Sequence, residues 1–380
     1  MKTWKLDSTS ELISQVSVNG KSVLEIGFGG DMAIAAIQAG AASASACDLG
    51  QKQILQAERK ASAASVVPTL SSANIESSLP DKADIVICGP LNSYRDPLRV
   101  LRTIALSAKE AVVLVNQELQ GKKIRKQKEF QGIFGRRRLR ELNNSPVAYL
   151  SPLGDAKWSP NFIPTISGLS YLLDGHMRLF QSVEHSFIGE HLLTIAKRLR
   201  IDHLVVVAGC NSAGKSTLCQ MLRDDQFPDI FKESLSDSIF VAPSTLTRGA
   251  TKATFPDPTE KTAIFHYDIS SAEDLGTNYF SRDISTDILF CANRTTHVLV
   301  APSPELLRTQ LASAQKNRYL TLFDESDFLS GLYSEWIGFA SSISHNSKFL
   351  LYTDVGTSRQ LTDLASASEA HSAIREIYSS

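Results

Sequence analysis

The chain has 380 residues, of which 43% are hydrophobic and 21% are charged, and its formal net charge is −1. This balance is typical of a globular protein of two or three domains, and it excludes a disordered or fibrous chain. No stretch approaches the ~20 consecutive apolar residues of a membrane span, and the start of the chain lacks the apolar core of a secretion signal. Five scattered cysteines without a CxxC pair favour free thiols in a reducing cytoplasm over a metal cluster or disulfide framework.

The two halves of the chain differ in charge. Residues 1–199 hold 24 Lys and Arg against 18 Asp and Glu, whereas residues 200–380 hold 15 against 22. Much of the positive excess lies in residues 122–140, which carry nine basic side chains with Phe130 and Phe134 between them. Such a segment can dock a phosphate-rich ligand or can be a solvated loop, so nucleic acid is a possible but not a favoured partner. The asymmetry predicts a domain boundary between the halves.

Short apolar runs alternate with helix-length stretches throughout the chain. Examples are the runs SVLEIGF, ADIVICG, HLVVVAG and THVLVA. Strands spaced by helical lengths indicate β-α units and parallel sheets. The sequence therefore predicts an α/β protein of two domains, residues 1–199 and 200–380.

The first chemical signal in chain order is a glycine-rich turn after the apolar run SVLEI. Gly27, Gly29 and Gly30 lie in this turn, a helical stretch follows it, and a second strand ends at Asp48. In such a unit the backbone of the turn can approach a ligand closely, and the acidic residue can accept hydrogen bonds from ribose hydroxyls. By itself the turn fits a dinucleotide-binding oxidoreductase as well.

The segments after Asp48 distinguish between these possibilities. Residues 83–116, 158–185 and 190–198 are similar, in order, to the fourth and fifth strand region, the late helix and the last strand of class I S-adenosylmethionine-dependent methyltransferases. The resemblance covers about residues 20–199. It implies a Rossmann-like methyltransferase fold that ends in antiparallel strands, S-adenosyl-L-methionine as cofactor, and methyl transfer as activity.

This resemblance also implies which residues bind the cofactor. Gly27, Gly29, Gly30 and Asp48 match its cofactor loop and acidic residue. Glu25 either positions the methionine part of the cofactor or caps the strand.

Three positions depart from the pattern of the family. Asp31 replaces the usual third glycine, Asn74 stands where many relatives have an adenine-contacting Asp, and Ser93 stands where many have His. The amide of Asn74 can still bond adenine. The loop with Asn92, Ser93 and Tyr94 lies where the family places the substrate, and the absence of an N-P-P-Y motif favours an oxygen as methyl acceptor.

The most specific signal in the chain is a G-x-x-x-x-G-K-[ST] motif. It follows the strand HLVVVA and precedes a helical stretch, the context in which this motif binds nucleotide phosphates. Its backbone N–H groups would cradle phosphate oxygens, Lys215 would reach the β- and γ-phosphates of ATP, and Ser216 would bind Mg²⁺. The predicted nucleotide-binding residues are Gly209, Asn211, Ser212, Ala213, Gly214, Lys215, Ser216 and Thr217.

A phosphate-binding loop also needs a carboxylate for Mg²⁺ at the end of a buried strand. Asp268 follows five mostly apolar residues and is the first candidate, and Asp287 and Asp354 are its rivals.

The stretch THVLVAPSPELLRTQL predicts a strand, a turn and a helix carrying Arg308. It resembles the lid region of nucleoside-monophosphate-kinase-like proteins, a resemblance that covers about residues 200–380. Arg308, Lys316 and Arg318 are its candidate phosphate clamps, and solvated helix charges are the alternative. The absence of an N-K-x-D motif disfavours a GTP switch.

The leading hypothesis is a bifunctional enzyme. It joins a P-loop kinase domain to a methyltransferase domain, acts on a small molecule or glycan, and is located in the cytoplasm. The alternatives are an RNA-modifying methyltransferase with an ATPase module, a nucleotide-binding regulatory protein with an inactive methyltransferase-like domain, and a dinucleotide-dependent oxidoreductase. The sequence does not reveal the oligomeric state.

Overall fold

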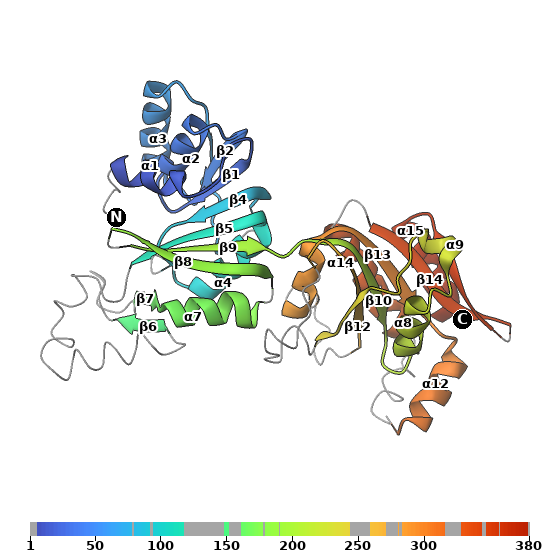
Figure 1. The fold of residues 1–380 in the computed structure, drawn as a ribbon. Helices are drawn as coiled ribbons and strands as arrows, with labels where there is room; N and C mark the ends of the chain where they lie inside the picture. The colour runs from blue at the N-terminus through green and yellow to red at the C-terminus, as the bar shows by residue number, and fades with distance from the viewer. Residues whose placement is uncertain are drawn as a thin grey trace, which may run out of the picture. The chain divides into compact units, whose positions relative to one another are not determined.

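The computed structural model divides the chain into two compact units, Met1–Leu199 and Arg200–Ser380 (Figure 1). It describes residues 6–77, 80–91, 94–117, 148–151, 161–177, 179–189, 191–243, 259–270, 280, 283–315, 328–343, 347–356 and 358–378. Within these ranges, no helix has the length and apolar character needed to cross a membrane. All five cysteines are buried, and none of them forms a disulfide bond, as the sequence predicts.

The first unit alternates strands with helices and then ends in strands. Its elements are α1 (Leu6–Ser14), β1 (Ser22–Ile26), α2 (Asp31–Gln38), β2 (Ser43–Cys47), α3 (Gln51–Ala63), β3 (Thr69–Leu70), β4 (Ala83–Cys88), α4 (Pro97–Ser107), β5 (Ala108–Gln117), β6 (Ala148–Ser151), β7 (Asn161–Pro164), α7 (Ile166–Ser170), the π-helix η3 (Tyr171–His176), β8 (Phe180–Ile188) and β9 (His191–Arg198).

Seven of these strands form one sheet in the order β3-β2-β1-β4-β5-β9-β8. The strands from β3 to β5 run parallel, and β9 pairs antiparallel with both β5 and β8. From β1 the chain moves to one side for β2 and later to the other side for β4. The carboxyl end of β1 is therefore a switch point, the place where open α/β sheets bind ligands.

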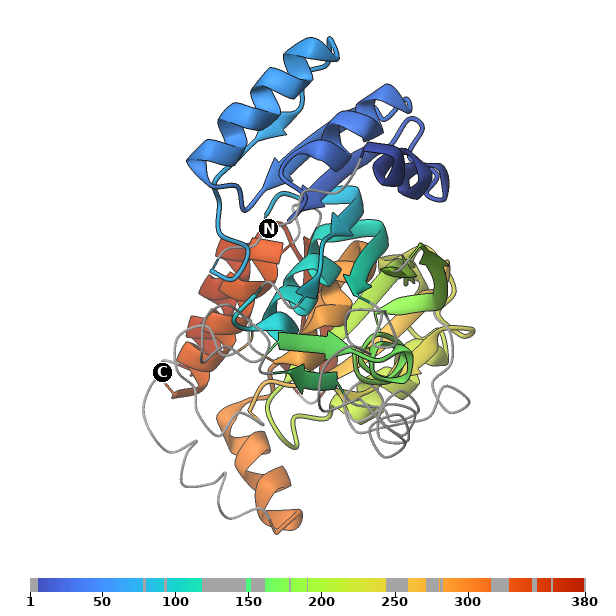
Figure 2. The same cartoon turned by 90° about the vertical axis from the view of Figure 1, so that its left-hand side faces the viewer.

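Helices cover both faces of this sheet because its central strands are apolar on both sides. On one face α1 and α2 lie against each other and against the strands, as Figures 1 and 2 show in blue. The alternate residues of β4 and β5 point to the opposite face, where α4 contacts both strands.

The second unit also alternates strands and helices. Its elements are β10 (Ile201–Gly209), α8 (Lys215–Arg223), α9 (Pro228–Phe231), β11 (Ile239–Val241), β12 (Thr262–Asp268), the 3₁₀ helix η4 (Ile284–Cys291), β13 (Ala292–Val300), α12 (Pro304–Ser313), α14 (Phe328–Ile343), β14 (Ser347–Val355), β15 (Ser358–Leu364) and α15 (Ala367–Tyr378).

Six strands form its sheet, in the order β11-β12-β10-β13-β14-β15. All pairs are parallel except β14 with β15. Because β10 lies between β12 and β13, its carboxyl end is the switch point of this second sheet. Both units thus have the mixed α/β architecture with parallel strands that the sequence predicts.

Each face of the second sheet has its own packing. Side chains of α8 and α12 pack with alternate residues of β10, β13 and β14 on one face. Aromatic rings fill the other face, where Trp336 of α14 stacks on Tyr267 of β12 with ring centroids 4.9 Å apart. This packing holds α14 against β12, and the parallel pairing of β12 with β10 matters for the site below.

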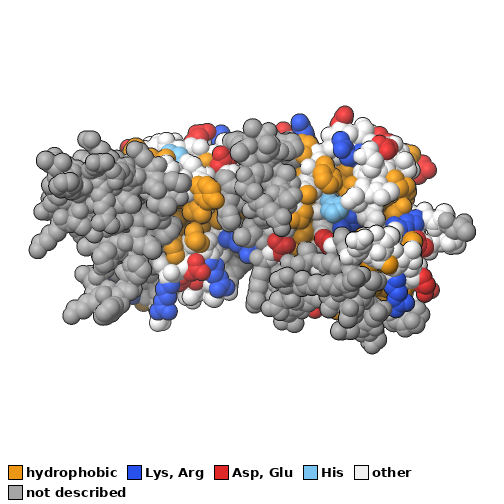
Figure 3. All heavy atoms as spheres, turned by 90° about the horizontal axis from the view of Figure 1, so that it is seen from below, with side chains coloured by type: hydrophobic (Ala, Val, Ile, Leu, Met, Phe, Trp, Pro, Cys, Tyr) orange, Lys and Arg blue, Asp and Glu red, His pale blue; other side chains and the backbone are white. Residues whose placement is uncertain are grey.

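The surface drawn in Figure 3 shows basic and acidic side chains interspersed among the described residues of both units. The basic segment 122–140 lies outside the described residues, so the prediction of a phosphate-rich partner for it stays a prediction.

Candidate functional sites

A buried carboxylate organises the glycine-rich turn of the first unit. Glu25, in β1, is fully buried, and its side chain accepts hydrogen bonds from the backbone N–H groups of Phe28 (3.2 Å), Gly30 (2.6 Å) and Ala33 (2.9 Å). Burial raises the pKa of Glu25 from 4.5 to about 7, against the opposing effect of these N–H donors. Of the two roles open for Glu25 in the sequence, the structure supports a structural one, because both of its oxygens bond the backbone of the turn.

Close packing explains one of the glycines. Gly30 precedes α2 with a φ of 93°, and a Cβ at this position would lie 2.6 Å from the Cβ of Ala57 in α3. The next residue, Asp31, occupies the position of the family's third glycine. Its carboxylate is almost buried and pairs with Lys60 of α3 at 2.6 Å. Asp31 therefore forms an ion pair with α3, and the ammonium of Lys60 neutralises its carboxylate.

Asp48 lies directly after β2, next to the glycine-rich turn. The register explains why: Ile26 of β1 pairs with both Cys47 and Cys88, so the residues that follow all three strands meet at one edge of the sheet. Burial raises the pKa of the half-buried Asp48 carboxyl, and the nearby Glu76 raises it further. Asp48 also adopts a left-handed conformation, with a φ of 61°.

A tyrosine hydroxyl borders the same edge. The Tyr94 hydroxyl is buried, and a Cβ placed on Gly27 would lie 3.0 Å from it. It lies near enough to lower the pKa of Asp48, yet it has no hydrogen-bond partner of good geometry. A buried hydroxyl without a partner costs free energy unless a ligand bonds it. Tyr94 is thus placed beside the turn, while Asn92 and Ser93 lie outside the described residues.

Two further amides lie near this edge. Asn74 is exposed, and its side-chain oxygen accepts a hydrogen bond from the backbone N–H of Glu76 at 2.8 Å. Asn116, which the sequence did not single out, is 1% exposed and accepts a hydrogen bond from the N–H of Leu91, while its amide nitrogen has no partner. Asn74 therefore shapes a local turn, and Asn116 offers a buried donor at the end of β5.

The G-x-x-x-x-G-K-[ST] segment of the second unit connects β10 to α8. Gly209 is the last residue of β10, Lys215 is the first residue of α8, and Ser216 and Thr217 follow it on the exposed side of the first turn. Inside the loop, the N–H of Asn211 donates to Ser270 at 2.8 Å, and Ser212 has a φ of 61°. The strand–loop–helix context expected from the sequence is therefore present.

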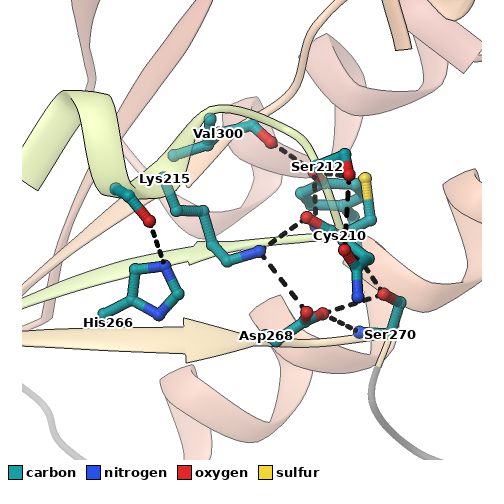
Figure 4. A network of polar contacts seen from close by, with 10 residues as sticks. Cys210, Ser212, Lys215, His266, Asp268, Ser270 and Val300 are labelled. Atoms are coloured by element: carbon teal, nitrogen blue, oxygen red, sulfur yellow. Dashed lines mark hydrogen bonds and ion pairs between the residues drawn. The ribbon is translucent and has the colours of Figure 1, made fainter. Parts of the chain in front are cut away.

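Lys215 points into this loop and is almost buried (Figure 4). Its ammonium donates to the carbonyl of Cys210 at 2.6 Å and lies 3.7 Å from a carboxylate oxygen of Asp268. The parallel register pairs Asp268 with Gly209 and so places the carboxylate at the start of the loop. Among the three acidic candidates, only Asp268 pairs with Lys215: Asp354 pairs with an arginine described next, and Asp287 is buried in η4.

Arg359, on β15, holds the loop from the other side. Its guanidinium donates to the carbonyl of Ala213 at 2.9 Å and pairs with Asp354 at 3.0 Å. Gly214 has a φ of 96°, and a Cβ there would lie 2.5 Å from the Arg359 guanidinium. One guanidinium nitrogen of Arg359 is buried without a partner. This arginine brings a positive charge against the loop, and no motif in the sequence indicated it.

The first turn of α8 contacts a histidine. The Oγ of Ser216 lies 3.3 Å from Nε2 of His266, which is on β12 two residues before Asp268 (Figure 4). Burial lowers the pKa of His266, and the charge of Lys215 lowers it further. Within the described residues, no three His, Cys, Asp or Glu side chains form a metal-binding group. A cation at this loop would need hydroxyl or ligand oxygens as well.

Of the three predicted phosphate clamps, Arg308 lies within the described residues. The strand, turn and helix around Arg308 are present as β13 and α12, and Arg308 is exposed on α12. Lys316 and Arg318 lie outside the described residues, so their role as clamps stays a prediction.

Comparisons with known proteins found likeness only among solved structures. No family model and no curated protein matches the chain. Three S-adenosylmethionine-dependent methyltransferases each resemble 51% of it. That of Mesorhizobium loti is 15% identical, with 100% of its own chain covered and a TM-score of 0.36. That of Clostridium acetobutylicum is 12% identical, with 92% covered and a TM-score of 0.36. Magnesium protoporphyrin IX methyltransferase of Synechocystis, solved with S-adenosylmethionine bound, is 16% identical, with 77% covered and a TM-score of 0.33.

Each of these likenesses covers about half of the chain. Because every TM-score is below 0.5, the functional proposals depend on the contacts within the chain itself.

Proposed function

We propose that the chain is a bifunctional transferase. Its first unit binds S-adenosylmethionine and transfers the methyl group, and its second unit binds ATP with a divalent cation and transfers a phosphoryl group. A small molecule or glycan is the proposed acceptor of both groups.

One observation carries the first activity: a hydrogen-bonded glycine-rich turn and an acidic residue meet at the switch point of a parallel sheet. The carboxylate of Asp48 can accept up to about four hydrogen bonds, which is enough acceptor capacity for the two hydroxyls of a ribose. The backbone around Gly29 is open, because a Cβ placed there would meet no atom within 4 Å. These residues fit a nucleoside cofactor.

The residues of the first unit have distinct roles in this proposal. Glu25 holds the turn in the shape that receives the cofactor, and Asp48 orients the ribose. Bound S-adenosylmethionine would supply the electrophilic methyl group. The Asn116 amide nitrogen, which is buried without a partner, and the buried Tyr94 hydroxyl beside Asp48 would bond the cofactor or acceptor and fix its orientation.

Calorimetry of the full-length protein with S-adenosylmethionine and with NAD tests this proposal. We expect binding of S-adenosylmethionine alone. Binding of NAD alone would instead support the oxidoreductase hypothesis. Tritium transfer from labelled S-adenosylmethionine to fractionated small-molecule extracts would then identify the acceptor class. A protein that binds the cofactor but methylates no acceptor would indicate the regulatory alternative.

The second activity is supported by one arrangement: the Lys215 ammonium lies between the loop carbonyl of Cys210 and the carboxylate of Asp268. A buried ammonium in a loop at a helix N-terminus creates a strongly positive site for phosphate oxygens. The Asp268 carboxylate and the Ser216 hydroxyl, which lie near the Lys215 ammonium and the His266 ring respectively, are oxygen donors of the kind that Mg²⁺ prefers. The donor set therefore fits a nucleotide with a bound cation.

These groups would act through position and charge, which is how phosphoryl transfer is mainly catalysed. Lys215 would move from the Cys210 carbonyl to the β- and γ-oxygens and stabilise the charge that develops there. Asp268 and Ser216 would hold the cation, which neutralises the same oxygens. Arg359 would keep the Ala213 carbonyl turned away from the phosphates.

The test is ATP consumption with and without candidate acceptors, with mass spectrometry of the products. We expect a product heavier by one phosphate, no turnover in Lys215→Ala, and weaker cation dependence in Asp268→Asn. Equal ATP hydrolysis without any acceptor, and no phosphorylated product, would replace the kinase with an ATPase.

A further inference from the structure

The histidine beside the first turn of α8 points to the identity of the cation. We propose that His266 is a nitrogen ligand of the divalent cation at the nucleotide site, so that this site favours a first-row transition metal such as Mn²⁺ over Mg²⁺. The inference depends on the nucleotide binding proposed above and adds a third protein ligand to the expected Ser216 and Asp268.

The backbone places these three side chains together. Because successive side chains of a strand alternate between faces, His266 and Asp268 of β12 lie on the same face. That face is turned to the loop: Asp268 lies beside Lys215, and Nε2 of His266 lies 3.3 Å from Oγ of Ser216. Figure 4 shows the imidazole ring and the Asp268 carboxylate on the same side of β12 as the Lys215 ammonium.

The chemistry of the ring at this position suits a metal better than a phosphate. Nε2 of the ring faces the Ser216 hydroxyl, an expected cation ligand, at 3.3 Å. A neutral imidazole offers a lone pair on one nitrogen, which is how histidine binds metals.

The type of ligand then decides the preferred metal. Imidazole nitrogen suits first-row transition metals, whereas Mg²⁺ takes oxygen ligands almost exclusively. A hydroxyl and a carboxylate alone would leave Mg²⁺ as the natural choice. Adding His266 shifts the preference, and nucleotide oxygens and water would complete the coordination.

Pulsed electron paramagnetic resonance of Mn²⁺ tests the contact directly. The full-length protein is loaded with ADP and Mn²⁺, and the electron spin echo is examined for modulation by a directly bound ¹⁴N nucleus. We expect this modulation in the wild type, its loss in His266→Asn, and its retention in His371→Asn, which changes a histidine of α15. Mn²⁺ affinity in the presence of ADP should fall at least about tenfold in His266→Asn, as expected for a disturbed metal site.

Two further measurements separate the possible failures. ADP binding with Mg²⁺ should survive in His266→Asn, which would show that the variant still folds. If the wild type binds ADP and Mn²⁺ without ¹⁴N modulation, or if Mn²⁺ binds His266→Asn as tightly as wild type, the nitrogen ligand is refuted and the nucleotide site stands. If the wild type fails to bind ADP in the presence of either Mg²⁺ or Mn²⁺, the nucleotide site and this inference both fail.

Discussion

The glycine-rich turn of the first unit should depend on the charge and shape of one side chain. We predict that Glu25→Gln opens the turn and weakens S-adenosylmethionine binding. Glutamine has nearly the size of glutamate, but one of its two terminal atoms is an NH₂ donor. At pH 8 the wild-type carboxylate accepts from three N–H groups, those of Phe28, Gly30 and Ala33. The glutamine NH₂ must face at least one of them.

The size of the effect follows from these contacts. Leaving one buried N–H without an acceptor costs about 1–3 kcal/mol. If glutamine keeps its oxygen toward Phe28 and Gly30, the N–H of Ala33 loses its side-chain partner. Local opening should then increase about 5- to 150-fold, and cofactor affinity should fall by a similar factor if the open turn cannot bind.

Hydrogen exchange and calorimetry at pH 8 measure the two effects. Residues 27–34 should exchange faster in Glu25→Gln, and S-adenosylmethionine should bind more weakly. Glu110→Gln is the matched control, because Glu110 pairs with Lys21 on the surface and such a pair contributes little. Equal exchange and equal affinity in Glu25→Gln and wild type would refute the role assigned to Glu25.

Three further predictions follow from the same contacts. Asp48→Ala should weaken S-adenosylmethionine binding about ten- to a hundredfold, because it removes a charged acceptor for ribose hydroxyls; equal affinities in calorimetry would overturn the assignment. The pKa of Glu25 is raised from 4.5 to about 7, so the folded unit holds a proton that the unfolded chain releases. The free energy of unfolding of the first unit should therefore fall by up to about 3 kcal/mol as the pH rises from 4.5 to 7. Hydrogen exchange of the slowest β1 amides should show this fall in the wild type. If the same fall persists in Glu25→Gln, the titration of Glu25 is not its cause. Arg359→Ala and Arg359→Lys should both weaken ADP binding about tenfold, because neither keeps the guanidinium that bonds both the Ala213 carbonyl and Asp354. The control Arg375→Ala, on α15, should leave ADP binding unchanged. Fluorescence titration with a labelled ADP measures both effects.

The sequence predicted the parts of both sites that depend on neighbours along the chain. A strand followed by glycines and a helix is a local pattern, so the turn at Gly27 to Gly30 and the loop from Gly209 to Lys215 could be found without a structure. The order of strands and helices likewise predicted two parallel α/β units. Asp268 could be named as the candidate cation carboxylate because the end of a buried strand is also a local feature. The structure places this carboxylate beside Lys215, and its role as a cation ligand stays a prediction.

Other residues could not be found because pairing between distant strands brings them to their sites. Arg359 contacts the carbonyl of a residue 146 positions earlier, and only the antiparallel pairing of β15 with β14 places it there. The contact of His266 with Ser216 depends on the register of β12 against β10. Asp31 departs from the pattern of the family, and its pairing with Lys60 of α3 could not be read from the sequence.

Native mass spectrometry of the full-length protein tests most directly the claim that the chain has two separate ligand sites. The protein is measured with S-adenosylmethionine and ADP–Mn²⁺ together, beside its Asp48→Ala and Lys215→Ala variants. We predict a wild-type species that carries both ligands, a Lys215→Ala species that carries only S-adenosylmethionine, and an Asp48→Ala species that carries mainly ADP. A wild-type protein that binds neither ligand, or variants that bind both as well as wild type does, would contradict the account.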